Sequence, residues 1–261
     1  MNRSRRVHVA LTPADFPGLA LDGRAALVVD VLRATTTVVA ACAAGCARIV
    51  PVADRDAALV AAARYPSGEA LLAGERGGRT LTGFHLGNSP LEYVPERVAG
   101  RTVIFTTTNG TEAMLHAGRA AAAAAAALVN VNAAARWALE QERDLTVLCA
   151  GERGALSLED AVCAGILVER MLAEAGALEL TDAALAALRL GEHYAERLDR
   201  LGLESAWGRN LARQGRAVDL DACLRLATSA LVPIFEAGII VPGPGAPPAA
   251  VARAAQREGG G

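Results

Sequence analysis

Short apolar segments alternate with longer helical patterns through the first 150 residues, and this alternation constrains the fold more than any other feature. The segments of strand length are Val7–Leu11, Ala25–Val29, Arg48–Val52, Ala70–Ala73, Thr102–Phe105 and Leu145–Cys149. The helical patterns between them are Thr35–Ala44, Arg55–Arg64, Thr111–Ala117 and Ala133–Glu142. Strands that alternate with helices typically form a parallel sheet with helices on its faces. The sequence therefore predicts an α/β fold, a three-layer α/β/α arrangement with a mixed, largely parallel sheet.

Two of these segments carry further predictions. Ala25–Val29 is continuously apolar, as expected for a strand covered on both faces, so it is predicted to be central. Ala120–Ala127 is an unbroken run of alanine, which favours a helix by intrinsic propensity. The alternation along the chain calls for a strand at this point instead, and we predict a short strand.

From Ser157 onward the patterns are helical only, which predicts a helix-rich C-terminal half. The predicted helices are Leu158–Ala175, Asp182–Leu201, a short piece near Leu203–Arg213, and Leu220–Leu226. Gly176, Gly202 and Gly215 are predicted to end helices. We expect a single domain over residues 1–241, with room for two subdomains, and a flexible tail over residues 242–261, which is rich in Gly and Pro.

Composition excludes several classes of function. The 261 residues carry a net charge of −2, which gives no basic surface for nucleic acid. All 26 basic residues are Arg, so Schiff-base and phosphate-loop chemistry through a lysine is excluded. Five scattered cysteines, an N-terminus without an apolar core and no long apolar run indicate a cytoplasmic protein without a membrane span.

Polar groups gather where predicted strands end, which is where α/β sheets bind ligands. The first group is Asp30–Thr37, directly after the central strand. Asp30 can hold a hard cation, while Arg33, Thr35 and Thr36 at a helix start can bind phosphate oxygens. The alternative is that the acid and the hydroxyls only cap the helix.

A glycine-rich stretch supplies the second group. Glu75 is a candidate metal ligand, and Arg76, Asn88 and Ser89 are candidates for binding anionic oxygens. The same stretch is equally compatible with a long surface loop in which Asn88-Ser89-Pro90 starts the next helix.

A second hydroxyl-rich helix start follows the strand Thr102–Phe105. Asn109, Gly110 and Thr111 there are predicted to face the same sheet edge as Asp30. The structural alternative is a capping pair between Asn109 and Glu112.

The last group runs from Cys149 to Gly165. Glu159 and Asp160 are adjacent at a helix start and point in different directions, so at most one is expected to face the site. Asp160 also has capping-box spacing with Ser157, which is a structural alternative. Cys149 is better explained as a small buried residue than as a nucleophile.

Taken in order, Asp30–Thr37, Gly83–Pro90, Thr106–Thr111 and Ser157–Gly165 resemble the 2-phosphosulfolactate phosphatase family, over roughly Val7 to Pro233. The resemblance implies an enzyme, a magnesium-dependent phosphoric monoester hydrolase acting on 2-phospho-3-sulfolactate in coenzyme M biosynthesis. Two residues depart from the family pattern: His85 stands where the family usually has Asp, and Glu152 replaces a small or hydroxyl residue.

On this resemblance we expect Asp30 and Glu75, with Glu159 or Asp160, to hold Mg²⁺. A metal-activated water, deprotonated by the metal or by Asp160, would attack phosphorus. The remaining residues would bind the small anionic substrate: Arg33, Thr35, Thr36, Asn109, Gly110 and Thr111 its phosphoryl group, and Arg76, Asn88 and Ser89 its sulfonate and carboxylate end.

Alternatives remain at this point. The substrate could be another small phosphoester, or the chain a non-catalytic anion-binding protein, although carboxylates in three separate stretches favour catalysis. A covalent aspartyl-phosphate route needs a second Asp two residues after Asp30, and Leu32 stands there. Oligomeric state is open, with a homodimer as one option.

Overall fold

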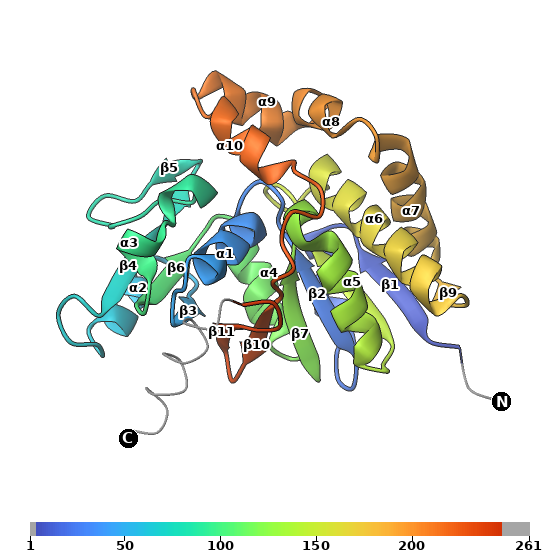
Figure 1. Ribbon diagram of the computed structural model, residues 1–261, viewed down its shortest axis with the longest axis horizontal. Helices are drawn as coiled ribbons and strands as arrows, with labels where there is room; N and C mark the ends of the chain where they lie inside the picture. Colours follow the sequence, from blue (N-terminus) through green and yellow to red (C-terminus); the bar gives the residue numbers. More distant parts are fainter. Residues whose placement is uncertain (1–3, 247–261) are drawn as a thin grey trace.

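The computed structural model describes residues 4–246 and contains an 11-stranded sheet with helices on its faces (Figure 1). The strands are β1 (Arg6–Ala10), β2 (Ala25–Val29), β3 (Arg48–Pro51), β4 (Ala70–Arg76), β5 (Arg79–Thr80), β6 (Thr102–Thr106), β7 (Ala122–Ala126), β8 (Leu145–Cys149), β9 (Glu179–Leu180), β10 (Pro233–Glu236) and β11 (Ile239–Pro242). The α-helices are α1 (Ala34–Ala43), α2 (Arg55–Ala62), α3 (Pro95–Val98), α4 (Gly110–Ala117), α5 (Val131–Glu140), α6 (Leu158–Ala175), α7 (Asp182–Tyr194), α8 (Leu198–Glu204), α9 (Ala206–Arg213) and α10 (Ala217–Cys223). Short 3₁₀ turns lie at Pro13–Gly18, Pro90–Glu92 and Leu128–Asn130. The α/β class with a largely parallel sheet is confirmed.

The sheet consists of two parallel sets joined by an antiparallel hairpin. Its strand order is β5-β4-β6-β3-β11-β10-β7-β2-β8-β1-β9. Strands β4, β6 and β3 are parallel to one another, as are β7, β2, β8, β1 and β9. Because the β10–β11 hairpin introduces three antiparallel pairings between β3 and β7, the two sets run in opposite directions. Figure 1 shows the first set on the left and the second on the right.

Strand β2 occupies the interior of the second set, as its apolar sequence predicts. All five of its residues are buried, and it pairs in parallel with β7 on one side and β8 on the other. Leu27 and Val29 face a core formed with α5, α6 and α7, whereas Ala26 and Val28 face a second core formed with α1 and α4. Burial on both faces explains why no polar residue interrupts this strand.

Helices α1 and α4 connect the two parallel sets. Helix α4 contacts β2 and β8 of the second set as well as β3 and β6 of the first, and α1 packs on β7 and the hairpin. The helices α8, α9 and α10, together called the helical cap, group at one end of the molecule in Figure 1. The described elements therefore place helices between the two sets and on the outer face of each.

The alanine run forms a strand, and the prediction made against its intrinsic propensity is confirmed. Strand β7 consists of five alanines, four of them buried, and lies between β2 and β10. Helix α1 contacts β7, so small side chains there let helix and sheet approach closely. Tertiary pairing thus overrides the helical preference of alanine.

The helices that follow Asp182 differ from the expected pattern in two ways. The predicted helix Asp182–Leu201 is divided into α7 and α8, and Gly202 lies inside α8 instead of ending a helix. No Gly or Pro marks the break at residues 195–197. Its cause is tertiary packing, because the turn buries Leu201 in the core and brings the Tyr194 hydroxyl within 2.6 Å of a carboxylate oxygen of Glu204, to which it donates. Gly176 and Gly215 follow helices with positive φ, as predicted.

The β10–β11 hairpin was not foreseen from the sequence. Ala237 and Gly238 turn it, both with left-handed φ, and Ala-Gly is a weak turn signal beside Asn-Gly or Asp-Gly. Pro242, where the predicted tail starts, ends β11, and Val232 donates its N–H to the Pro244 carbonyl oxygen at 2.9 Å. Residues 247–261 of that tail lie outside the described residues.

Within residues 4–246, no helix is both long and apolar enough to cross a membrane.

We predict that Gly165→Ala on α6 destabilises the fold by about 1–3 kcal/mol or more, because overpacking displaces well-fitted neighbours. An added Cβ would overlap the Ala187 carbonyl oxygen on α7 and lie 2.8 Å from the Gly191 nitrogen. Gly118→Ala is the matched control, since its Cβ would meet only the Leu115 carbonyl oxygen, at 3.4 Å. Urea unfolding of both variants measures the difference; equal midpoints would contradict close α6–α7 packing.

Candidate active site

Strand ends from both parallel sets line one pocket. Asp30 follows β2, Glu75 lies near the end of β4, and Glu152 comes shortly after β8. The space amounts to about 330 Å³, including open solvent at its mouth. The lining residues are Asp30, Leu32, Arg33, Glu75, Gly77, Asn88, Thr108, Asn109, Glu152, Arg153 and Trp207. Because the two sets run in opposite directions, their carboxyl ends approach the pocket from two sides.

Asp30 is the buried acid at the centre of the pocket. Its Oδ1 accepts the Ala34 N–H at 3.1 Å, at the start of α1. Gly110, the first residue of α4, packs so closely that a Cβ there would lie 2.6 Å from Asp30 Oδ2. Burial raises the pKa of Asp30 from 3.8 to about 7, and the nearby carboxylates of Glu75 and Glu159 add to the rise. Asp30 can therefore exchange a proton near neutral pH.

Glu75 is fixed by two backbone donors. One carboxylate oxygen accepts the Gly78 N–H at 2.7 Å, and the other accepts the Thr108 N–H at 2.8 Å. Arg76 is its neighbour on the strand and therefore points to the opposite face. The Arg76 guanidinium donates to the Glu75 carbonyl at 2.7 Å and to the Thr106 hydroxyl at 3.0 Å, and Arg76 does not line the pocket.

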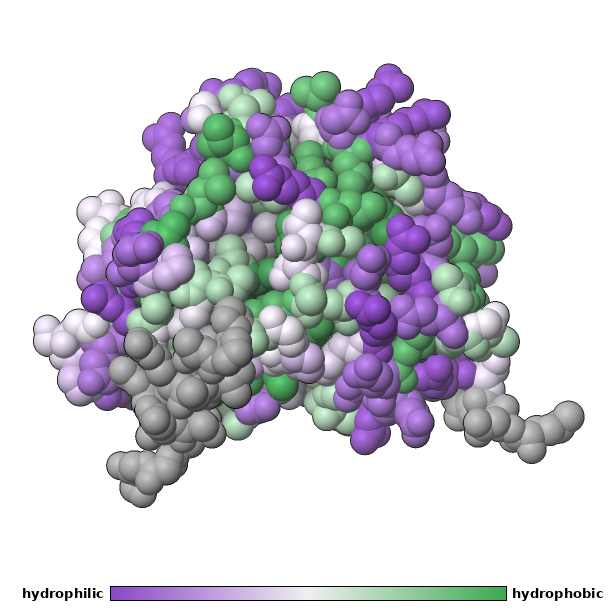
Figure 2. Space-filling model, viewed as in Figure 1, coloured by the Kyte–Doolittle hydropathy of each residue, from purple (hydrophilic) through white to green (hydrophobic). Residues whose placement is uncertain are grey.

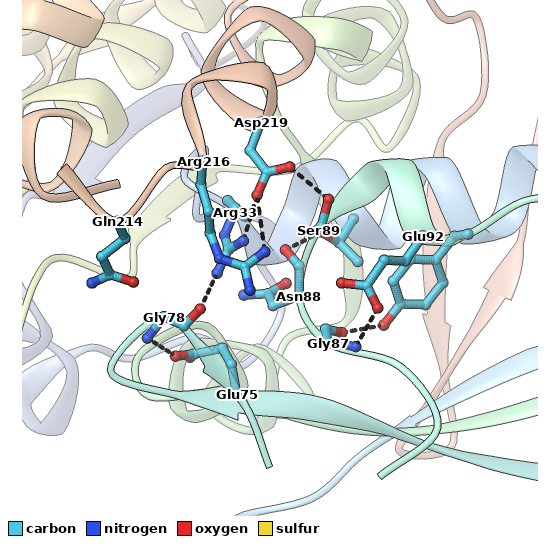
Figure 3. Close-up of polar contacts among 12 residues, drawn as sticks. Arg33, Glu75, Gly78, Gly87, Asn88, Ser89, Glu92, Gln214, Arg216 and Asp219 are labelled. Carbon is cyan, nitrogen blue, oxygen red and sulfur yellow. Dashed lines mark hydrogen bonds and ion pairs between the residues drawn. The ribbon is translucent and has the colours of Figure 1, made fainter. Parts of the chain in front are cut away.

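Arg33 is the buried cation of the pocket. Its guanidinium is paired with Asp219 of α10, with an Nη1–Oδ2 distance of 2.5 Å, and Nη2 donates to the Gly78 carbonyl at 3.1 Å. Figure 3 shows this contact between the helical cap and the turn after β4. Arg33 Nε is buried and has no hydrogen-bond partner.

Asn88 and Ser89 reach the same region from the loop after β5. Asn88 lines the pocket, and its Oδ1 is buried without a hydrogen-bond partner. Ser89 does not line it; its hydroxyl instead donates to Asp219 Oδ1 at 2.6 Å (Figure 3).

The opposite wall contains Asn109, Glu152 and Arg153. Asn109 donates from Nδ2 to Glu152 Oε2 at 3.0 Å and accepts the Arg153 N–H at 3.1 Å. Burial raises the pKa of Glu152. Arg153 Nε lies 3.3 Å from Glu152 Oε1, and the Arg153 side chain is 72% exposed, so it can move toward a ligand.

The threonine hydroxyls predicted to bind phosphate are engaged by the backbone. Thr35 donates to the Asp30 carbonyl at 2.8 Å, Thr36 to the Val31 carbonyl at 2.9 Å, and Thr111 to the Thr107 carbonyl at 3.0 Å. None of the three lines the pocket, and none of them caps its helix, because α1 and α4 have no side-chain cap hydrogen bond.

Asp160 and Glu159 are both buried and lie outside the pocket lining. Asp160 accepts the Val31 N–H at 2.8 Å and the Gly151 N–H at 3.1 Å, and so ties the loop after β2 to the loop after β8. Burial and the charge of Asp30 raise the pKa of Asp160 well above its usual value. Burial also raises the pKa of Glu159. The geometry gives Asp160 a positioning role.

The described residues contain no group of three Asp, Glu, His or Cys side chains arranged to hold a metal ion. The expected set of Asp30, Glu75 and Glu159 or Asp160 is thus not assembled. Magnesium needs only one or two carboxylates, with waters and substrate phosphate completing its shell. Asp30 and Glu75, with the unpaired Asn88 oxygen, suit that chemistry.

The sequence did not indicate three residues of the site: Trp207 and Arg153 in the pocket lining, and Asp219, which contacts Arg33. Asp219 and Trp207 belong to the helical cap, more than 170 residues from Asp30, and no local pattern links them to it. Arg153 is adjacent to Glu152, a residue that departs from the family pattern. That departure was the sequence signal that could have pointed to Arg153. His85 lies outside the pocket, where its Nδ1 accepts the Leu72 N–H at 3.0 Å. All five cysteines are buried and none lines the pocket, and burial raises the pKa of Cys149.

A mixed α/β fold with carboxylates, arginines and an unpaired amide oxygen at converging strand ends suits an enzyme that binds small anionic substrates. The model of the 2-phosphosulpholactate phosphatase family matches residues 10–238. The chain therefore belongs to this family, which is one of phosphoric monoester hydrolases.

Relatives called "Probable 2-phosphosulfolactate phosphatase" support the same assignment. One from Symbiobacterium thermophilum is 42% identical over 86% of this chain and 97% of its own length. Another from Deinococcus radiodurans is 41% identical over 91% of this chain and 96% of its own length. A third, from Gloeobacter violaceus, is 40% identical over 84% of this chain and 91% of its own length.

We predict that the metal-free protein loses stability as pH rises from 5 to 8, and that Asp30→Asn reduces this loss. The folded-state pKa of Asp30 is raised to about 7, so between pH 4 and 7 the folded chain binds more protons than the unfolded chain. Between pH 5 and 8, stability therefore falls by roughly 3 kcal/mol more in the wild type than in the variant. Urea unfolding with chelator at both pH values tests this.

The exposed Asp56→Asn, on α2, is the control and should keep the wild-type pH dependence. Parallel stability profiles for wild type and Asp30→Asn would show that burial does not perturb Asp30.

Proposed function

We propose that the chain is a magnesium-dependent phosphatase that hydrolyses 2-phospho-3-sulfolactate to 3-sulfolactate and phosphate. The names of its family and relatives support the substrate. The observation that carries the proposal is a pair of buried, unpaired polar atoms at one pocket, Arg33 Nε and Asn88 Oδ1. Buried polar groups are normally hydrogen-bonded, so an unpaired donor and acceptor together favour a polar ligand.

The charge of the pocket supports a divalent cation. Three carboxylates and two guanidiniums line it, and Arg33 is already paired with Asp219. A substrate bearing phosphate, carboxylate and sulfonate would meet net negative charge unless a cation intervened. Asp30 and Glu75, with Asn88, would hold Mg²⁺. When bound, the ion would offset phosphoryl charge and lower the pKa of a coordinated water.

The chain's own side chains would orient the substrate and accept a proton. Arg33 Nε donates to a phosphoryl oxygen with the charge-assisted geometry that favours phosphate. Asp30 lines the pocket beside the proposed metal position, so it is the proposed proton acceptor. Asp160 has both oxygens engaged by backbone donors, and we assign it to positioning Val31 and Gly151 instead.

We also propose Arg153 for the second anionic group of the substrate, in place of Arg76. Arg153 lines the pocket and is largely exposed, whereas the Arg76 guanidinium is engaged by backbone carbonyls and Thr106. Within residues 4–246 Arg153 has one ion pair, with Glu152, and pairs of so exposed a side chain contribute little and exchange easily.

Phosphate release from 2-phospho-3-sulfolactate is expected to need added magnesium and to stop with chelator. Asp30→Asn and Glu75→Gln should each lower kcat/KM by about 100-fold or more, since each removes charge from the proposed metal and proton site. Asp56→Asn should behave as wild type. Wild-type rates in both pocket variants would refute the assignment, and full activity in chelator would refute the metal.

Arg153→Gln is expected to lower kcat/KM about 10-fold or more for the sulfonate-bearing ester, but little for the same ester without a sulfonate, because one charge-assisted contact is worth about 1.5–3 kcal/mol. Arg79→Gln, at an exposed position on β5, is the matched control. Equal losses with both esters would show that Arg153 does not recognise the second anionic group.

A further inference from the structure

A carboxylate of the helical cap, that of Asp219, lies between Arg33 of the pocket lining and Ser89, next to the lining residue Asn88. Asp219 is 2% exposed, and each of its oxygens has its own partner: Oδ2 pairs with Arg33 Nη1 at 2.5 Å, and Oδ1 accepts the Ser89 hydroxyl at 2.6 Å. Arg216 lies further away, at 3.7 Å from Oδ2. Figure 3 shows Asp219 above these side chains, reaching down from α10 toward Arg33 and Ser89.

The contact with Asp219 determines which nitrogen of Arg33 remains free to donate to a ligand. The guanidinium is planar, and two of its nitrogens are held from different sides, Nη1 by Asp219 and Nη2 by the Gly78 carbonyl. Two anchored nitrogens fix the plane of the group. The unpaired Nε is therefore held in one position in the pocket lining instead of turning among several.

For Asn88, the contact acts through the adjacent residue. Ser89 is held by Asp219, while the Asn88 carbonyl accepts the Thr37 hydroxyl at 3.1 Å. The backbone around Asn88 is thereby anchored on both sides, by α10 and by α1. Its unpaired Oδ1 keeps its place in the same pocket as Arg33 Nε.

We propose that Asp219 is the positioning residue of the phosphoryl-binding pocket, one carboxylate that orients both Arg33 and Asn88. This inference rests on the proposed function for the identity of the ligand. A buried ion pair is a weak source of stability, because desolvation offsets its attraction. The main consequence of this pair is geometric: it couples the helical cap to the substrate contacts.

Asp219→Asn keeps the shape of the side chain and removes its charge. It is expected to weaken binding of inorganic phosphate, measured by calorimetry on the full chain with magnesium present, by 10-fold or more, and to raise KM more than it lowers kcat. Asp221→Asn, exposed on the same helix, is the matched control and should bind as wild type. Wild-type affinity in Asp219→Asn would overturn the proposal.

A double-mutant cycle separates positioning from a general structural effect. If Asp219 acts through Arg33, adding Asp219→Asn to Arg33→Gln causes little further loss of phosphate affinity, because the group it orients is gone. The double variant also leaves no buried charge unpaired. Losses that multiply across the two substitutions would mean that Asp219 does not act through Arg33, and would overturn the proposal.

Ser89→Ala keeps the ion pair intact and serves if Asp219→Asn fails to fold, as judged by thermal unfolding. It should reduce phosphate affinity several-fold through Asn88; unchanged affinity would refute that half of the proposal. Failure of the proposed function is a separate result: a wild type that releases no phosphate from the ester yet binds phosphate through Asp219 and Arg33 would leave this inference standing.

Discussion

The site depends first on the two hydrogen bonds that Asp160 accepts from Val31 and Gly151. These backbone groups belong to the loops after β2 and β8, which would otherwise bury N–H donors without partners. One carboxylate satisfies both and fixes the separation of the loops. Asp30 and Glu152 stand one residue from those anchor points, so their positions in the pocket follow from this contact.

Burial is the common cause of the unusual electrostatics. Asp30, Glu159 and Asp160 lie close together out of water, and burial is the largest cause of the raised pKa of each. Charge repulsion adds to burial: Glu75 and Glu159 raise the pKa of Asp30, and Asp30 and Glu159 raise that of Asp160. The charge of Glu152 raises the pKa of Glu159. On the proposed function, a bound cation would offset the charge of the acids that line the pocket and so make the pocket compatible with an anionic ligand.

Local sequence patterns were sufficient for the parallel strands of the first 150 residues and for some of the site, but not for the short parallel strand β9. Ala25–Val29 and Leu145–Cys149 match β2 and β8 residue for residue, because a strand buried on both faces needs an uninterrupted apolar run. Asp30, Glu75, Arg33, Asn88 and Asn109 share the pocket, as strand-end placement suggested. Arg76 could not be excluded from the site without knowing which face of β4 lies toward the pocket. Asp219 could not be found because its contact with Arg33 joins residues 186 positions apart in the sequence.

The β10–β11 hairpin, which the sequence did not predict, explains why residues from distant parts of the chain contribute to the site. Most open α/β sheets bind ligands along one carboxyl edge, where parallel strands end together. Here β10 and β11 reverse the direction of the second set relative to the first, with α1 and α4 packed between the sets. The ends of β2 and β8 then approach the pocket from one side, and the ends of β4 and β6 from the other. A ligand bound there contacts both sets, and the helical cap completes the enclosure with Trp207 in the lining and Asp219 on Arg33. Substrate binding in such an arrangement is sensitive to how the two sets are held together, and the elements that join them are the hairpin within the sheet and the helices α1 and α4 packed against it.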